Sequence, residues 1–321
     1  MKACFLVKPS NIEEKPLVAR EIRLKELAED EVLVKVEYCG ICKIDLDIIE
    51  GKWMLYGYPR KLPLIPGHEI IGRIEKLGSK VSNFKLNERV AISFIYDSCD
   101  KCYNCLMNRQ DLCESLIITG ESADGGLAEF IRIKSKRLIK VPQWIKDETF
   151  ALCEFAIAFK GLNYIENSFE SRIAIIGDDM IAKFAKAIAE IRNMEIKHFS
   201  MRKNDPSSNE LKYVEKGYFD YAIVTCDSHI IIEEILNKLR KGGKLILTGL
   251  SSIKIPHFFE NKKIIGIGIP NQVEIIKSFE LLKKMNISDV EKKYFKLEEA
   301  NEVFREIKYG SIKKFIFYNK A

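Results

Sequence analysis

The sequence of 321 residues lacks several features that mark whole classes of protein. It has no uninterrupted run of about 18 apolar residues, which a membrane-spanning helix requires. Its first residues are not a charged start followed by a long apolar stretch, as a secretion signal would be. Its net charge is +6, but no basic block is interleaved with aromatic residues as a nucleic-acid groove would need. We therefore expect a cytoplasmic protein that binds neither membrane nor nucleic acid.

Low-complexity tracts and internal repeats are also absent, and the composition is that of a folded chain. Hydrophobic residues make up 47% of the sequence and charged residues 31%, so the chain can bury the cores of two ordinary domains. Basic and acidic residues alternate along the chain, which is typical of a solvated surface of mixed charge.

The spacing of apolar residues changes along the chain. Residues 1 to about 142 contain short β-type runs closed by Gly, Pro or charged residues, which predicts a β-rich unit. From about residue 171, strands alternate with helices, which predicts a parallel, doubly wound sheet. The closing stretch, 297–319, predicts a helix and then a strand, which we expect to return to the first unit.

Four of the nine cysteines lie within fifteen positions, in the segment CDKCYNCLMNRQDLC. Thiolates this close on one loop can converge on a tetrahedral ion, and four soft anionic ligands suit zinc. Because protein would fill all four positions, the site should be closed and structural. We predict that its ligands are Cys99, Cys102, Cys105 and Cys113.

Further potential metal ligands are scattered along the chain: Cys39 in YCGICKID, His68 with Glu69 in PGHE, and Cys153 or Glu154 in FALCEFAIAFKGL. Two thiolates and one imidazole would leave the fourth position of a zinc ion open for water or substrate, as in catalytic zinc sites. Taken singly, each of these residues is also compatible with a packed core position.

These motifs, in this order, resemble the zinc-dependent medium-chain alcohol dehydrogenases nearly from end to end. The matching landmarks are YCGIC with Asp45, PGHE, the four-cysteine segment, DGGLAEF at 124–130, the strand and turn at 172, LRKGGKLILTGL and LEEANEVF. The resemblance implies a GroES-like catalytic domain and a Rossmann domain inserted within it. The expected ranges are 1–153 plus 271–321 for the catalytic domain, with the structural zinc lobe at 95–115, and 154–270 for the Rossmann domain.

The resemblance also implies a catalytic zinc site: Cys39, His68 and Cys153 as ligands, Glu69 as an occasional extra ligand, and Asp45 in the immediate surroundings. Cys153 is favoured because the following AFKGL is similar to a run common in the family. Glu154 is the alternative, because sugar-alcohol members carry a glutamate in this region. In the family the zinc polarises an alcohol or carbonyl oxygen while hydride passes between its carbon and the nicotinamide ring.

The chain departs from the family at the proton relay. Members that oxidise alcohols usually have Ser or Thr five residues after the first ligand cysteine, and often a His three residues further on. Here Ile44 and Asp47 occupy these positions. Isoleucine cannot carry a proton, so another group or water carries it, or the reaction is hydride delivery to a conjugated double bond or an imine.

The stretch RIAIIGDDMIAKFAKAIAEI, at 172–191, has the strand, turn and helix of a dinucleotide-binding fold but only one of its glycines. We expect the cofactor-binding turn to contain Gly177, Asp179, Met180 and Ile181. Asp179 stands where the middle glycine normally lets the pyrophosphate approach the helix N-terminus. Either its carboxylate repels phosphate, and the chain is a zinc-containing binding or regulatory protein, or it caps the helix and points away.

The cofactor choice depends on the end of the second strand. Ser200 occupies the position where an acid usually binds the ribose hydroxyls, and Arg202 and Lys203 follow it. A missing acid beside basic residues favours NADP(H) over NAD(H). Only about twenty residues separate EIKHFS from FDYAIVTC, too few for a further strand and helix, so the sheet should have a trimmed edge.

Together, the sequence predicts a two-domain α/β oxidoreductase with a structural and a catalytic zinc. It would use NAD(P)(H) to interconvert an alcohol and an aldehyde or ketone of small size. The apolar strand IIGIGI could pair across a two-fold axis, so we expect a homodimer or homotetramer.

Overall fold

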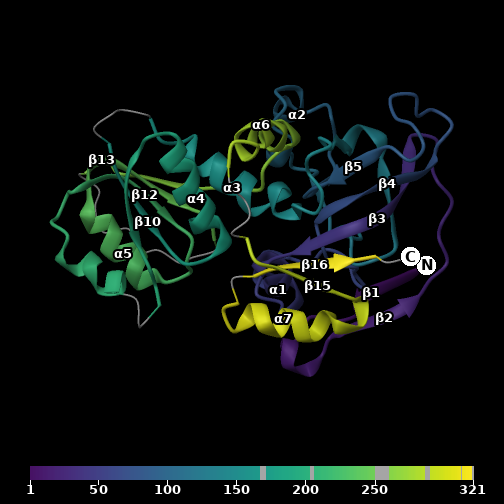
Figure 1. Ribbon diagram of the computed structural model, residues 1–321, viewed down its shortest axis with the longest axis horizontal. Helices are drawn as coiled ribbons and strands as arrows, with labels where there is room; N and C mark the ends of the chain where they lie inside the picture. The colour runs from purple at the N-terminus through teal and green to yellow at the C-terminus, as the bar shows by residue number, and fades with distance from the viewer. Residues whose placement is uncertain (167–170, 203–205, 250–259, 286–289, 312, 320–321) are drawn as a thin grey trace. The chain divides into compact units, whose positions relative to one another are not determined.

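The structure is a computed structural model that describes residues 1–166, 171–202, 206–249, 260–285, 290–311 and 313–319. The chain divides into two compact units (Figure 1). Unit 1 consists of Met1–Cys153, Asn271–Ile276 and Asn286–Ala321, and unit 2 of Glu154–Pro270 and Lys277–Met285. The divisions after 153 and 270 coincide with the expected boundaries, whereas 277–285 groups with unit 2.

A seven-stranded sheet forms the body of unit 1. Its order is β15-β16-β3-β4-β5-β9, and β8 also pairs with β3. The strands are β3 (Glu31–Ile41), β4 (Glu69–Leu77), β5 (Arg89–Ile92), β8 (Phe130–Lys134), β9 (Ile139–Lys140), β15 (Lys292–Phe295) and β16 (Lys314–Tyr318). Two small sheets pair β1 (Lys2–Leu6) with β2 (Leu17–Glu21) and β6 (Ile95–Asp97) with β7 (Ile117–Ile118).

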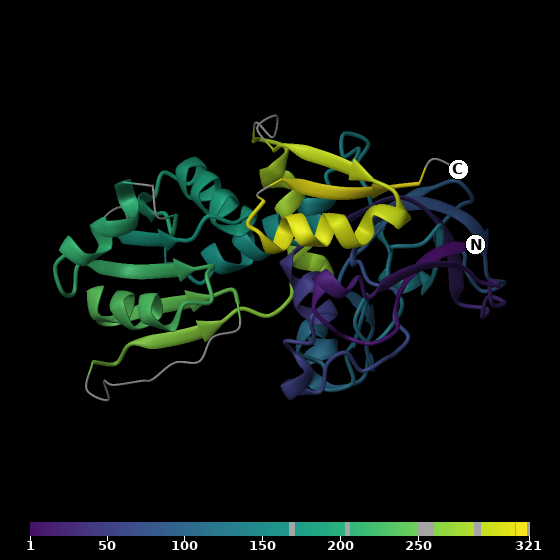
Figure 2. The same ribbon diagram turned by 90° about the horizontal axis from the view of Figure 1, so that it is seen from below.

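The helices of unit 1 are short. They are η1 (Ile12–Glu14), α1 (Lys43–Ile49), η2 (Met54–Tyr56), α2 (Tyr103–Leu106), η3 (Gln110–Leu112), η4 (Ser135–Arg137), η5 (Thr149–Leu152), η7 (Leu297–Glu299) and α7 (Ala300–Lys308). The C-terminal strand β16 pairs antiparallel with β3, placing Phe317 opposite Cys39. In Figure 2 the yellow C-terminal segment and the purple N-terminal segment lie in the same unit, with the two marked ends of the chain on the same side of it. The predicted return of the C-terminal strand is therefore confirmed.

Unit 2 is built on five parallel strands in the order β11-β10-β12-β13-β14. They are β10 (Arg172–Ile176), β11 (Glu195–Phe199), β12 (Phe219–Val224), β13 (Leu239–Leu247) and β14 (Lys263–Gly266). The helices are α3 (Glu154–Leu162), α4 (Met180–Ile191), η6 (Pro206–Tyr213) and α5 (His229–Lys238), while α6 (Gln272–Leu282) belongs partly to each unit. Strands such as RIAII are apolar on both faces, as expected when a parallel sheet is buried on both sides.

Strand β11 is the edge of this sheet among the described residues. Between β11 and β12 the described residues contain η6 instead of a further strand and α-helix. The predicted two-unit α/β architecture with a trimmed parallel sheet is thus confirmed. Within the described part of the chain, no helix combines the length and apolarity needed to cross a membrane.

Candidate metal centres and dinucleotide turn

The four cysteines of the lobe converge. One ligand atom from each of Cys99, Cys102, Cys105 and Cys113 lies within 4.8 Å of all the others. The Cys99 sulfur is 3.9 Å from that of Cys105 and 3.5 Å from that of Cys113. Zinc with four Zn–S bonds of about 2.3 Å holds its sulfurs about 3.8 Å apart. Since all nine cysteines are free thiols, the four residues fit a closed zinc site.

Backbone groups prepare part of this lobe cluster for a cation. The N–H groups of Lys101 and Cys102 stabilise the Cys99 thiolate and lower its pKa to about 6. Burial instead raises the pKa of Cys113 to about 11. The local backbone therefore favours one anion before metal binds, whereas Cys113 needs the metal to lose its proton.

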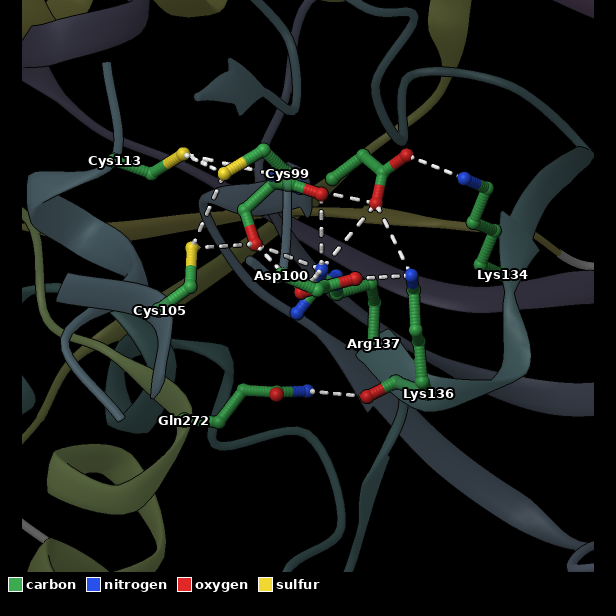
Figure 3. A network of polar contacts seen from close by, with 10 residues as sticks. Cys99, Asp100, Cys105, Cys113, Lys134, Lys136, Arg137 and Gln272 are labelled. Carbon is green, nitrogen blue, oxygen red and sulfur yellow. Dashed lines mark hydrogen bonds and ion pairs between the residues drawn. The ribbon is translucent and has the colours of Figure 1, made fainter. Parts of the chain in front are cut away.

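A buried cation stands beside the same cluster (Figure 3). Arg137, on η4, is 4% exposed and donates a 2.8 Å hydrogen bond to the Ser98 hydroxyl. That hydroxyl lies 3.5 Å from the Cys105 sulfur. Arg137 also pairs with Asp97 and Asp100 of the lobe. This network fixes the cysteine segment against η4.

A second cluster gathers residues from three distant segments. Ligand atoms of Cys42, His68, Glu69 and Cys153 all lie within 4.8 Å of one another. The Cys42 sulfur is 3.6 Å from His68 Nε2 and 3.9 Å from the Cys153 sulfur. Each of the four residues is at most 8% exposed. The two thiols and the imidazole have the spacing of ligands on a tetrahedral zinc, which would keep a position for a further ligand.

Asp45 orients this second cluster (Cys42, His68, Glu69 and Cys153), which we call the catalytic cluster after its predicted role. Its Oδ2 accepts a 3.0 Å hydrogen bond from the backbone N–H of Cys42, closing a capping box at the start of α1. Its Oδ1 accepts from the N–H of Gly67 and lies 3.0 Å from His68 Nδ1. Because Nδ1 is engaged, Nε2 is the ring nitrogen that faces the sulfurs. Carboxylate partners of this kind fix the tautomer and direction of metal-binding histidines.

The structure corrects one predicted ligand, because Cys42 and not Cys39 belongs to the cluster. Cys39 lies inside β3, is fully buried, and its burial raises the pKa of its thiol. A side-chain carbon added to Gly67 or Gly126 would come within 2.6 or 2.7 Å of the Cys39 sulfur, so Cys39 fills the core against these glycines. The signal for Cys42 was its position three residues before Asp45, the spacing of a capping box.

The other predicted cluster residues differ in their surroundings. Glu69 forms a buried ion pair with Lys314, at 2.6 Å, and its Oε1 is 3.9 Å from His68 Nε2. Cys153 follows η5 and contributes its sulfur to the cluster. Glu154, the alternative to Cys153, begins α3, is buried, and is not one of the four clustered residues.

The surroundings of the catalytic cluster favour an ionised Cys42 thiol beside a protonated His68 ring. Burial raises the pKa of Cys42, but its contacts with Cys153 and His68 outweigh burial and lower that pKa to about 6. Burial lowers the pKa of His68, whereas Asp45 and Cys42 raise it well above the usual value. A thiolate is therefore available to a cation near neutral pH.

The expected relay positions hold no hydroxyl or imidazole. Ile44 is half-buried, and its backbone N–H donates to the Cys42 sulfur. The carboxylate of Asp47 is held by Lys43 at 3.0 Å and Lys52 at 2.6 Å. These positions are counted from Cys39; counted from Cys42 they become Asp47 and Glu50, which also hold no hydroxyl or imidazole.

At the dinucleotide turn, Asp179 caps α4. Its Oδ1 accepts a 2.9 Å hydrogen bond from the N–H of Ala182. Gly177 has a φ of +135°, a conformation that favours glycine, and a side-chain carbon there would collide with the Thr225 hydroxyl. Met180 and Ile181 form the first turn of α4. The geometry favours the capping interpretation of Asp179.

The predicted ribose-side residues lie at the end of β11. Ser200 is buried and its hydroxyl accepts a 3.2 Å hydrogen bond from the backbone N–H of Arg202. Arg202 is exposed. Lys203 lies outside the described residues.

The chain is similar to known alcohol dehydrogenases in sequence, and it shares its fold with solved dehydrogenase structures. Residues 28–143 match the alcohol dehydrogenase GroES-like domain family. An alcohol dehydrogenase of Geobacillus stearothermophilus is 28% identical, over 93% of this chain and 95% of its own length. Two solved structures share the fold: a cobalt- and zinc-bound thermostable alcohol dehydrogenase of Pyrobaculum aerophilum (TM-score 0.85, 20% identity, 99% of each chain), and CAD of Helicobacter pylori with NADP(H) (TM-score 0.83, 20% identity, 99% of this chain and 97% of that one).

Proposed function

We propose that this chain belongs to the zinc-dependent medium-chain alcohol dehydrogenases and acts as a zinc-dependent oxidoreductase. It interconverts a small alcohol and the corresponding aldehyde or ketone with a nicotinamide dinucleotide. The observation that carries the proposal is the buried cluster of Cys42, His68 and Cys153, whose ligand atoms have tetrahedral spacing. Zinc held by these residues would supply Lewis-acid polarisation of the substrate oxygen.

Residues around the cluster orient its histidine and balance its buried charge. Asp45 fixes the ring of His68 through Nδ1, and Phe94 stacks on the ring with centroids 4.0 Å apart. Lys314 balances the negative charge of Glu69 within the same buried region. Because these groups are shielded from water, polar interactions within the cluster are stronger than they would be in solvent.

The turn after β10 is the proposed cofactor site. The first N–H groups of a helix lack intrahelical partners and attract phosphate. The Asp179 carboxylate accepts a hydrogen bond from the N–H of Ala182, and this cap keeps the N-terminus of α4 ordered. The sequence-based preference for NADP(H) rests on Ser200, Arg202 and Lys203 and stays a prediction.

We also propose a homodimer or homotetramer that forms through β14. This strand is an edge of the five-stranded sheet among the described residues, and its sequence is KIIG. An edge strand has unpaired backbone groups that a second copy can pair.

One observation favours a second reaction of the same class. Ile44 offers no proton-carrying group, and the carboxylate of Asp47 is held by two lysines. Reduction of a conjugated double bond does not need the proton to leave a zinc-bound alcohol. An NADPH- or NADH-dependent enone reductase is therefore the alternative.

A substrate panel distinguishes the two reactions. The zinc-loaded protein is incubated with alcohols and oxidised cofactor, and separately with aldehydes, ketones or enones and reduced cofactor, while absorbance of the reduced nicotinamide is followed. The metal-free protein, and the same protein after zinc is restored, serve as controls. We expect zinc-dependent turnover of alcohols and carbonyl compounds. Turnover of enones alone would establish the alternative, and turnover that is unaffected by zinc removal would contradict both the cluster's role and the proposal.

A further inference from the structure

The turn after β10 contains two aspartates with different partners. Asp179 caps α4, as described above. Asp178 instead reaches across to the end of β11: its Oδ1 accepts a 2.7 Å hydrogen bond from the Ser200 hydroxyl, and its Oδ2 accepts a 2.6 Å bond from the N–H of Met201. The Asp179 carboxylate is thus bonded to its own helix, whereas the Asp178 carboxylate is bonded to residues at the end of the neighbouring strand.

The location of Asp178 follows from the sheet pairing. Strands β10 and β11 are parallel neighbours with Ile176 opposite Phe199, so their carboxyl ends lie side by side. The N–H of Gly177 donates to the Phe199 carbonyl at 3.1 Å, which fastens the turn to this edge. In dinucleotide-binding folds, the acid that receives the ribose hydroxyls stands at the end of this second strand. Here Ser200 occupies that position, and Asp178 brings a carboxylate to it from the turn.

The Asp178 carboxylate has capacity beyond its two hydrogen bonds to residues that the structure describes. A carboxylate offers about four acceptor positions, so one used on each oxygen leaves room for donors from a ligand. Asp178 is also partly exposed. The 2′ and 3′ hydroxyls of an adenosine ribose are donors of the required kind. A 2′-phosphate offers no such donor when ionised and would bring negative charge against the carboxylate.

We propose, given the proposed function, that Asp178 is a specificity-determining residue that makes unit 2 select NAD(H) over NADP(H). Its carboxylate comes from the turn after β10 and takes the place of the acid that is missing at the end of β11. This preference is opposite to the one that Ser200 and Arg202 indicate in the sequence, because the sequence does not reveal that Asp178 reaches Ser200.

Titration of the full-length, zinc-loaded protein with NADH and NADPH tests the proposal, with Kd taken from nicotinamide fluorescence. We expect the wild-type protein to bind NADH at least about tenfold more tightly, and Asp178→Asn to reduce that ratio by about tenfold. Asp179→Asn removes the same charge one residue away and is the matched control. It should leave the ratio of the two Kd values unchanged.

Three further measurements keep the test independent of folding and of the zinc site. Ser200→Ala keeps the charge at Asp178 and should retain the NADH preference, and thermal melting shows whether each variant is folded. ADP-ribose and its 2′-phosphate, titrated by calorimetry, isolate the adenosine half and should reproduce the preference.

The outcomes separate this proposal from the proposed function. If both cofactors bind but Asp178→Asn leaves their ratio unchanged, or if the folded wild-type protein prefers NADPH, only the role of Asp178 is overturned. If neither cofactor nor either adenosine fragment binds a protein with its full zinc content, the proposed oxidoreductase function fails together with it.

Discussion

The two thiol clusters of unit 1 use similar ligands but are assembled differently. The lobe cluster takes all four thiols from 99–113, so the chain needs only a local loop to bring them together. The catalytic cluster joins Cys42 to Cys153 across 111 positions and places His68 between them. Local spacing therefore predicts the first cluster completely, whereas the second depends on how β3, β4 and η5 pack.

The two clusters also differ in what they offer a metal. The lobe provides four thiols and lies partly at the surface, since Cys99 and Cys102 are half-buried. The catalytic cluster provides two thiols, an imidazole and a carboxylate, all buried. A closed site stabilises the fold, and a site with fewer strong protein ligands can exchange one position for substrate. The first two of the following changes test that distinction.

Loss of a ligand should separate catalysis from stability. Cys153→Ala removes a ligand of the catalytic cluster, so kcat should fall about a thousandfold or more as several kcal/mol of electrophilic stabilisation disappear. Cys105→Ala, the matched change in the lobe, should mainly lower the melting temperature. Steady-state kinetics and thermal unfolding of both variants check this. A large kcat loss for Cys105→Ala with an unchanged melting temperature would remove the distinction between the clusters.

Asp45→Asn should weaken metal binding at the catalytic cluster without removing a ligand. The change takes away the negative charge beside His68 Nδ1, and loss of such a partner typically lowers metal affinity by about 10- to 100-fold. Competition with a zinc chelator measures it. Asp47→Asn, on the same helix but bound to Lys43 and Lys52, is the control and should leave zinc affinity unchanged. Equal effects of the two changes would contradict the role of Asp45.

Acidification should weaken metal binding at both clusters. The pKa values of Cys42 and Cys99 are each lowered to about 6, so these thiols are ionised above that pH and protonated below it. Protons compete with zinc for thiolates, so zinc affinity should fall as the pH drops below about 6 and should change less above that pH. Competition with a zinc chelator over a pH series measures this. A zinc affinity that stays unchanged down to about two units below that pH would contradict the predicted competition.

The smallest expected effect concerns the turn of unit 2. Asp179→Ala removes the acceptor for the Ala182 N–H and should lower the free energy of unfolding by about 1 kcal/mol, whereas Asp179→Asn keeps an acceptor and should cost little. Denaturant unfolding of both variants provides the values. If instead Asp179→Asn tightens cofactor binding strongly, the carboxylate repels phosphate and does not merely cap the helix.

The fold was largely predictable because its signals are local. Parallel strands such as β10 are continuous apolar runs, and the cysteine spacing of the lobe marks its own site. The choice between Cys39 and Cys42 had one local signal, the capping-box spacing from Cys42 to Asp45, which the prediction of Cys39 did not use. Both lie in YCGIC, and β3 ends at Ile41, so Cys39 stays in the sheet while Cys42 leaves it to cap α1.

The partners of Asp178 could not be predicted from the sequence for a related reason. Its hydrogen bonds to Ser200 and Met201 depend on β10 and β11 being neighbours, which the spacing of residues in the turn does not encode. Residues whose roles arise from a strand end or from pairing of distant segments therefore need the tertiary structure. Those whose partners are a few positions away, such as the lobe cysteines, do not.

The most direct test of the account is the zinc content of Cys42→Ala and Cys39→Ala, measured by atomic spectroscopy on the purified, folded proteins. The two cysteines are three positions apart, both are buried, and only Cys42 belongs to the catalytic cluster. We predict two zinc ions per chain for the wild-type protein and for Cys39→Ala, and one for Cys42→Ala. Retention of both ions by Cys42→Ala, with loss of one from Cys39→Ala, would contradict the assignment of the catalytic cluster.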